Sequence, residues 1–304
     1  MDNRISSSPR PDQYARPEHN PPSRSAEQTT FSAVRRQATT TAQPFPGALA
    51  VAAEVVRGSE PATVRKRPGR LDLTSVKPAQ PVEPFQRLNE HFEQIKSLMK
   101  AAPRSEFSEV YPLPDYGQMH SVALLGEQHH GFRVTKPPEK MDGAGFIHAN
   151  AGRNGRFDGD KFHVSVANDQ LESGFAALAS LLFSPDSPVR EWKMTDLNAG
   201  RPDTPEGRRV TQGAQFTLYV RTGADGHYSA GQLKRIKDFV SEMERTLAAQ
   251  GIGMGERPAS DVAPEHWNYV SYRNEQRSGR DGTEEQALAL QREPFFRLVS
   301  DCPQ

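Results

Sequence analysis

Lys161 and His163 are the first residues in this sequence whose types and spacing suggest chemistry. They lie in GDKFHVSVANDQ, residues 159–170, where apolar and polar residues alternate as in a half-buried β-strand. Side chains two positions apart on a strand point to the same face, so a fixed cation and a titratable imidazole stand together. Such a pair could bind a phosphate group and give it a proton. A solvated polar sheet face is the commoner explanation, and the pair alone does not decide between the two.

Further basic side chains come from three other segments. They are Lys193 in EWKMTDLN, Arg208, Arg209 and Arg221 in RRVTQGAQFTLYVR, and Arg273, Arg277 and Arg280 in YVSYRNEQRSGRDG. Cations gathered from separate segments suit a compact, doubly charged anion such as a phosphate monoester, because arginine forks chelate its oxygens. Networks of surface salt bridges are the alternative.

The elements that must position these residues follow from hydrophobic periodicity. Apolar residues at steps of three and four predict helices over about 84–101, 171–184 and 229–250. Asp169 and Glu172 form an expected capping box before the second of these helices. Alternating or short apolar runs predict strands at 121–125, 145–149, 161–166, 192–195 and 214–221. Helices and strands mix without regular βαβ alternation, which favours an α+β fold with a mixed or antiparallel sheet.

Composition divides the chain into an arm, residues 1–80, and a body, residues 81–304. The arm has 12 Lys and Arg against 7 Asp and Glu, a net charge of +5, and ten of the 25 prolines. With so few large apolar residues, the arm is expected to be disordered. Because the whole chain has a net charge of 0, the body carries −5, which argues against a nucleic-acid-binding surface.

Several function classes are disfavoured by what the sequence lacks. No apolar run reaches the ~20 residues of a membrane helix, and the first residues lack the apolar core of a cleavable secretory signal. The single cysteine, Cys302, supports neither a disulfide framework nor a Cys-based zinc site. The nine histidines form no metal cluster, and the motifs of P-loop, zinc-protease and α/β-hydrolase enzymes are absent. We therefore expect no metal.

Taken together, several stretches resemble the phosphothreonine lyase family, type III secreted effectors that inactivate host MAP kinases. They are GDKFHVSVANDQ, LLFSPDSPVREWKMTDLN, GAQFTLYV, PASDVAPEHWNYVSYRNEQRSGRDG and REPFFRL, in this order between residues 84 and 304. The resemblance implies a compact α+β catalytic domain that acts on a pThr-x-pTyr activation loop. The implied reaction is a β-elimination of phosphate from phosphothreonine, which leaves dehydrobutyrine and needs no metal or organic cofactor.

The resemblance also implies roles for individual residues. Lys193 would be the general base that removes the Cα proton, and His163 the general acid that protonates the departing phosphate. The residues that would bind the phosphothreonine phosphate are Lys161, Arg209 and Arg273. The loop before Arg209 looks longer than in the family, so Arg208 is an alternative to it. We expect neighbouring cations and partial burial to lower the pKa of Lys193 from its ordinary value of about 10.4, since the base must be neutral.

Four further residues receive supporting or binding roles from the same resemblance. Tyr219 would support the site, and Asp261 would orient a basic partner. Arg221 and Arg280 are expected to bind the phosphotyrosine. The family is expected to have lysine where this chain has Arg221, a difference that keeps the charge and changes the donor geometry.

The arm contains a segment, residues 65–73, that resembles a MAP-kinase docking motif. Its basic and apolar residues are Arg65, Lys66, Arg67, Arg70, Leu71 and Leu73. A nuclear-import signal or a plain linker is the alternative for this short pattern. The first ~50 residues are expected, by composition and by the family resemblance, to serve secretion and translocation.

The expected partners and location complete the prediction. We expect a monomer that the type III system delivers into the host cell, to the cytoplasm or the nucleus. There it would act on dually phosphorylated MAP kinases, with a secretion chaperone as a further candidate partner and without nucleic acid or membrane. A non-catalytic inhibitor that binds the phosphorylated kinase, and a phosphatase that works by hydrolysis, are the alternatives.

Overall fold

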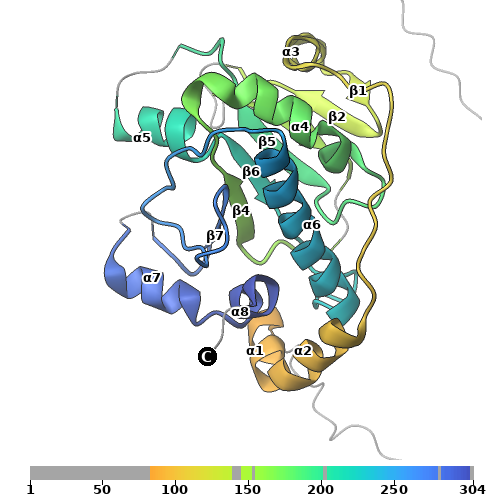
Figure 1. Ribbon diagram of the computed structural model, residues 1–304, viewed down its shortest axis with the longest axis vertical. Helices are drawn as coiled ribbons and strands as arrows, with labels where there is room; N and C mark the ends of the chain where they lie inside the picture. The colour runs from red at the N-terminus through yellow and green to blue at the C-terminus, as the bar shows by residue number, and fades with distance from the viewer. Residues whose placement is uncertain (1–82, 139–144, 153–154, 201–203, 280–281, 302–304) are drawn as a thin grey trace, which may run out of the picture. The chain divides into compact units, whose positions relative to one another are not determined.

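The computed structural model describes residues 83–138, 145–152, 155–200, 204–279 and 282–301 (Figure 1). The arm with its 65–73 segment, and Arg280, lie outside these residues. None of the helices in the described ranges is long and apolar enough to cross a membrane.

One sheet of seven antiparallel strands organises the described part of the chain, in the order β1-β2-β3-β5-β6-β4-β7. The strands are β1 (Gln128–His129), β2 (Phe132–Thr135), β3 (Phe146–Asn150), β4 (Asp160–Val164), β5 (Glu191–Thr195), β6 (Phe216–Tyr219) and β7 (Val270–Asn274). The helices are α1 (Pro84–Glu90), α2 (Phe92–Ala101), α3 (Tyr116–Leu125), α4 (Leu171–Phe183), α5 (Pro205–Arg208), α6 (Ala230–Ala249), α7 (Glu284–Gln291) and α8 (Pro294–Ser300). The expected α+β class is confirmed.

Apolar side chains cover one face of the central strands and pack against helices. Phe162 of β4 and Trp192 of β5 are fully buried on this face, and α4 and α6 lie across it, in front of the sheet in Figure 1. The Trp192 and Phe183 rings meet edge to face with centroids 5.4 Å apart. Each buried side chain of this size stabilises the fold by roughly 1.5–3 kcal/mol. Because Trp192 and Met194 point toward the helices, Lys193 between them must point to the opposite face.

Of the two explanations for the Lys161 and His163 pair, the solvated polar face does not apply to β4, because all five of its residues are buried. Lys161 is 5% exposed and His163 is 2% exposed. The alternation of side chains was correctly predicted, but both faces of this strand are covered. A buried cation beside a buried imidazole needs partners within the protein.

The strand expected at 121–125 is also wrong, since these residues form the last half of α3. A short apolar run has no period that distinguishes a buried strand from a helix. The helix begins with a capping box at Asp115, whose side chain accepts a hydrogen bond from the Gln118 backbone N–H, and it ends at Gly126 in the left-handed conformation.

Two predicted helix boundaries also differ. The expected 84–101 helix is interrupted at His91, which separates α1 from α2. Asp169 and Glu172 form no capping box, because residues 168–170 make a 3-10 turn and α4 starts at Leu171 without a side-chain cap. By contrast, α6 matches its prediction, with Ser229 as the cap that accepts from the Gln232 backbone N–H.

Candidate active site

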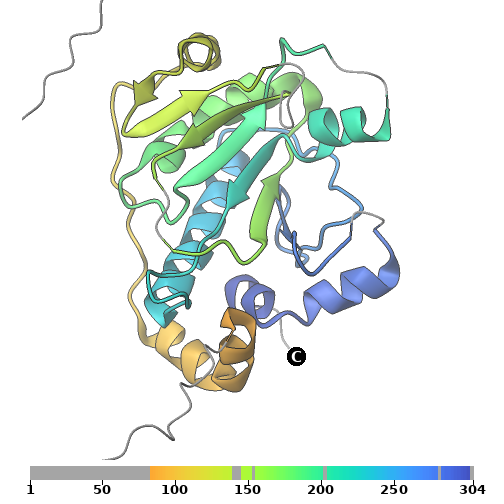
Figure 2. The same ribbon diagram turned by 180° about the vertical axis from the view of Figure 1, so that it is seen from behind.

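A row of polar side chains crosses the sheet face opposite α4 and α6. Figure 2 views the molecule from the side of this face. Thr217 of β6 pairs directly with Lys193 of β5 on one side and with His163 of β4 on the other. Ser271 of β7 pairs with His163 and continues the row. Residues paired in this way share one face of the sheet, so the register alone gathers them.

A second row runs beside the first, two residues away on each strand. Lys161 of β4 pairs with Tyr219 of β6 and with Arg273 of β7. Both cations are buried, with Lys161 5% and Arg273 3% exposed. Arg273 donates from Nη2 to the Ser278 carbonyl at 3.1 Å and from Nε to the Ser278 hydroxyl at 3.4 Å, which orients its guanidinium.

Lys161 has an acidic neighbour that the sequence motifs did not indicate. Its ammonium nitrogen lies 3.0 Å from a carboxylate oxygen of Glu275, the residue directly after β7. Burial lowers the pKa of Lys161, and Glu275 opposes that shift. The charges of Arg273 and Arg209 lower the same pKa further, so several cations act on one amine.

His163 is held by a buried carboxylate. Its Nδ1 lies 2.5 Å from Asp261 Oδ2, and the Ser271 and Ser260 hydroxyls donate to Asp261 at 2.8 and 2.9 Å. Nδ1 therefore carries the proton that faces Asp261, and Nε2 is the nitrogen that can serve a substrate. Burial lowers the pKa of His163, and Asp261 opposes this shift by favouring the imidazolium.

Lys193 reaches the same face from β5 and lies against aromatic rings. Its ammonium nitrogen is 4.1 Å from the centroid of the Phe146 ring and 5.9 Å from that of Tyr219. Strands lie about 4.8 Å apart, so the Cα atoms of Lys193 and His163, two strands apart, are about 10 Å from one another. The lowered pKa expected for Lys193 stays a prediction.

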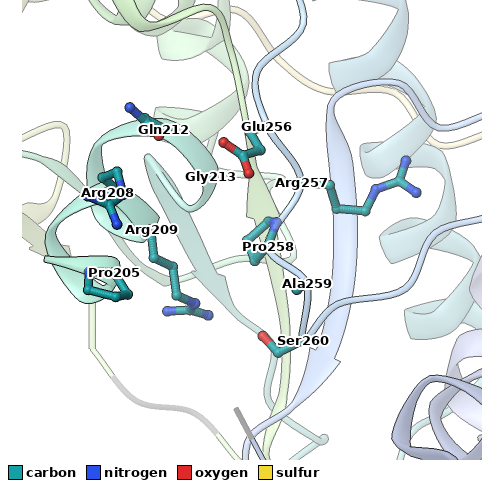
Figure 3. A pocket seen from close by; sticks show the side chains of 10 residues that line it. All are labelled: Pro205, Arg208, Arg209, Gln212, Gly213, Glu256, Arg257, Pro258, Ala259 and Ser260. Atoms are coloured by element: carbon teal, nitrogen blue, oxygen red, sulfur yellow. The ribbon is translucent and has the colours of Figure 1, made fainter. Parts of the chain in front are cut away.

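Arg209 comes to the site from a π-helical turn, residues Arg209–Gly213, and its charge acts on the pKa values of Lys161 and His163. Figure 3 shows its side chain running toward Ser260 in a pocket of about 290 Å³, which Arg208 also lines. The action of the Arg209 charge on Lys161 and His163 favours Arg209 over Arg208 as the neighbour of the two rows.

Arg221 is engaged in an ion pair at the border of this face. Its guanidinium lies 2.6 Å from the Glu191 carboxylate and 5.7 Å from the centroid of Phe157. Glu191 pairs across the sheet with Tyr219, so Arg221 lies beyond the second row. Arg280, its expected companion, is outside the described residues.

Sequence reasoning missed Glu275 and Phe146 as neighbours of the cations. Glu275 stands two residues after Arg273 in YRNEQR, but only the arginines of this segment were predicted to bind phosphate. Phe146 belonged to an expected strand, and nothing in its type indicated contact with a lysine. Among the described residues, no group of three His, Cys, Asp or Glu side chains is suited to hold a metal ion.

Comparison with known proteins identifies the family of this chain. The family model described as OspF/SpvC matches residues 62–301. The chain belongs to the OspF/SpvC family. Its relatives include the MAPK phosphothreonine lyase of Salmonella typhimurium, 40% identical over 218 residues, and phosphothreonine lyase OspF of Shigella flexneri, 41% identical over 219 residues. Each alignment covers 70% of this chain and 87% of the relative.

Solved structures of OspF/SpvC proteins are also similar to this chain. The Salmonella plasmid virulence C protein, SpvC, is 39% identical with a TM-score of 0.66, over 72% of this chain and 100% of that one. The VirA (SpvC) phosphothreonine lyase effector of Chromobacterium violaceum is 40% identical with a TM-score of 0.65, over 71% and 99%. The resemblance stated from the sequence motifs is confirmed.

Proposed function

We propose that this OspF/SpvC protein is a phosphothreonine lyase that acts on the pThr-x-pTyr activation loop of host MAP kinases. The observation that carries the proposal is the row Lys193–Thr217–His163 beside the cations Lys161 and Arg273. It offers a base, an acid and a phosphate site on one face. Relatives at 40% identity are named phosphothreonine lyases, which favours elimination over hydrolysis and over binding alone.

The proposed reaction breaks two bonds of the phosphothreonine and forms one double bond. Lys193 Nζ takes the Cα proton, and the electron pair left on Cα forms the Cα=Cβ bond. The Cβ–O bond breaks, and His163 Nε2 gives a proton to the departing phosphate. The residue becomes dehydrobutyrine, no water is consumed, and the hydroxyl that a kinase would phosphorylate again is lost.

Lys193 must be a neutral amine to act in this way. A backbone Cα–H is a very weak acid, and an ordinary lysine with a pKa of about 10.4 is protonated near neutrality. Nearby cations disfavour a further positive charge, and a pKa lowered by one corresponds to about 1.36 kcal/mol between the two protonation states. The same cations stabilise the charge that builds on the leaving oxygen, so they act in binding and in the transition state.

The remaining assignments extend the proposal to the binding of the two phosphates and to the positioning of His163. Lys161, Arg209 and Arg273 bind the phosphothreonine phosphate, while Arg221 and Arg280 bind the phosphotyrosine. Asp261 orients His163 through Nδ1 and favours the imidazolium, whose Nε2–H is the proton that the acid gives.

Outside the site, residues 81–304 form the catalytic domain and residues 1–80 the arm. The arm serves type III delivery into the host cell and docks on the kinase through residues 65–73. Tethering by this segment raises the local concentration of the activation loop at the catalytic domain.

Mass spectrometry of a treated pThr-x-pTyr peptide tests the reaction. Elimination gives a product lighter by one water than the hydrolysis product, and a thiol adds to its new double bond. Recovery of free threonine would instead identify a phosphatase. Inhibition of the kinase that stays stoichiometric, without any change in peptide mass, would identify a binding protein.

A further inference from the structure

Glu275 lies among the cations proposed to handle the phosphothreonine. Its Oε2 is 3.0 Å from Lys161 Nζ, and its side chain is 38% exposed while that of Lys161 is 6% exposed. The pair therefore joins a buried cation to an anion at the solvent edge of the site. A carboxylate and a phosphate present the same kind of acceptor oxygen to such a cation.

The charges around Glu275 come from three strands. Partial burial works to raise its pKa, but the pKa of Glu275 lies below its ordinary value because the charges of Lys161 and Arg273, and that of Lys193 in its protonated form, favour the carboxylate. The expected base and two of the expected phosphate-binding residues thus act on one anion. Glu275 is the counter-ion of the site, and it lies where the substrate would bring its own negative charge.

The backbone of Glu275 is fixed by hydrogen bonds, whereas its side chain is partly exposed and is held by the contact with Lys161. Its N–H donates to the Gly159 carbonyl at 2.7 Å. The neighbouring Asn274 side chain accepts from the backbone N–H groups of Gln276 and Arg277 at 3.0 and 2.8 Å and closes the turn. Rotations about the side-chain bonds of Glu275 can then carry its carboxylate away from Lys161 without disturbing the strands.

We propose that Glu275 is a specificity-determining residue of the proposed lyase, whose carboxylate takes the place of a phosphate oxygen on Lys161 until the phosphate dianion of the substrate displaces it. The inference rests on the proposed function. A singly charged group, such as a glutamate of another peptide, would exchange one carboxylate for another and gain little. A dianion carries the additional charge that makes displacement favourable, and Glu275 can return as the phosphate product leaves.

Substitution of Glu275 tests this with inorganic phosphate as the probe, measured near neutral pH by calorimetry and as a competitive inhibitor of peptide turnover. In Glu275→Gln the dissociation constant of phosphate should fall about tenfold, the equivalent of about 1.4 kcal/mol. Thermal stabilisation by phosphate should increase in the same variant. The KM of the phosphopeptide should fall, without a gain in kcat, because product release becomes slower.

Glu242→Gln is the matched control, since it removes the same charge from α6 on the opposite face, where Glu242 pairs with Arg104 at 3.1 Å. It should leave phosphate binding unchanged. Glu275→Asp keeps the charge with a shorter reach and should give an intermediate affinity, so it also serves if Glu275→Gln fails to fold.

Phosphate affinity that is unchanged or weaker in both Glu275 variants would overturn the proposal, because Glu275 would then support Lys161 throughout the cycle. Calorimetry with phosphate needs no turnover. A wild-type protein that produces no dehydrobutyrine would therefore refute the lyase, and the binding comparison would still decide what Glu275 does.

Discussion

Lys193 and His163 pair with the same residue, Thr217, from opposite sides of strand β6. The two side chains therefore stand on one face with a small threonine between them. Packing of Trp192 and Phe162 against the helices on the other face holds both strands in this register. A shift of one residue in either strand would turn one of the two polar side chains toward the core.

Replacing Lys193 tests the proposed base. Lys193→Ala should lower kcat on the phosphopeptide by about 10²–10⁴-fold, the usual contribution of a positioned base, and leave phosphopeptide binding in place. Lys96→Ala, an exposed lysine of α2, is the control and should be fully active. Single-turnover assays with calorimetry separate the two effects. Normal turnover in the Lys193 variant would remove this residue from the mechanism.

The Asp261 carboxylate should set the pH range of activity. Burial lowers the pKa of His163, and Asp261 opposes that shift. Without the carboxylate the pKa of His163 falls further, and a general acid is lost as pH rises through its pKa. The alkaline limb of kcat/KM should therefore move to lower pH in Asp261→Asn.

The control for this experiment is Ser271→Ala, which removes a hydroxyl that donates to Asp261 and keeps the carboxylate. Its alkaline limb should stay near that of the wild type. If Asp261→Asn instead moves the acid limb of kcat/KM to lower pH and leaves the alkaline limb in place, His163 acts as a base, and the proposed acid must be sought elsewhere.

Several structural features that depend on a local sequence signal were predicted correctly. The alternation in DKFHV predicted that Lys161 and His163 share a face, and the apolar stripe and Ser229 predicted α6. Strand register is long-range, so nothing near Lys193 in the sequence could place it beside Thr217. The prediction that Lys193 and His163 belong to one site came from the family resemblance, and no physical signal in the sequence indicated it.

Predictions were wrong where one sequence pattern is compatible with two structures. The apolar run at 121–125 fits a strand or a buried helix, and in the structure it is the second half of α3, which packs on β2 and β3. Glu275 was overlooked because a charged residue in a polar turn is usually solvated. Its contact with Lys161 depends on the pairing of β4 with β7, which exists only in the folded sheet.

Gly159 should be needed for the turn that presents Glu275. It has φ +91°, and an added Cβ would lie 2.5 Å from Asn274 Oδ1 and 2.9 Å from the Gln276 backbone N. Gly159→Ala should lower the free energy of unfolding by about 2 kcal/mol or more, because strain and collision add.

Gly226 separates these two causes, since it has φ +79° with nothing within 4 Å of an added Cβ. Gly226→Ala should lose only about 1 kcal/mol, the effect of the left-handed conformation. Urea unfolding measures both variants. Equal losses would mean that the packing around Asn274 yields easily, and that the turn is less rigid than its hydrogen bonds indicate.

Deleting residues 65–73 should separate docking from chemistry. Basic residues and the Leu71 and Leu73 side chains are proposed to hold the kinase, which raises the local concentration of its activation loop. The deletion should lower kcat/KM on a whole, dually phosphorylated MAP kinase by about tenfold or more, with no change on a short phosphopeptide. Deleting nine residues from the first ~50, proposed to serve secretion, is the control and should alter neither. If activity on the peptide falls as much as activity on the kinase, the segment supports the catalytic domain itself and does not act by docking.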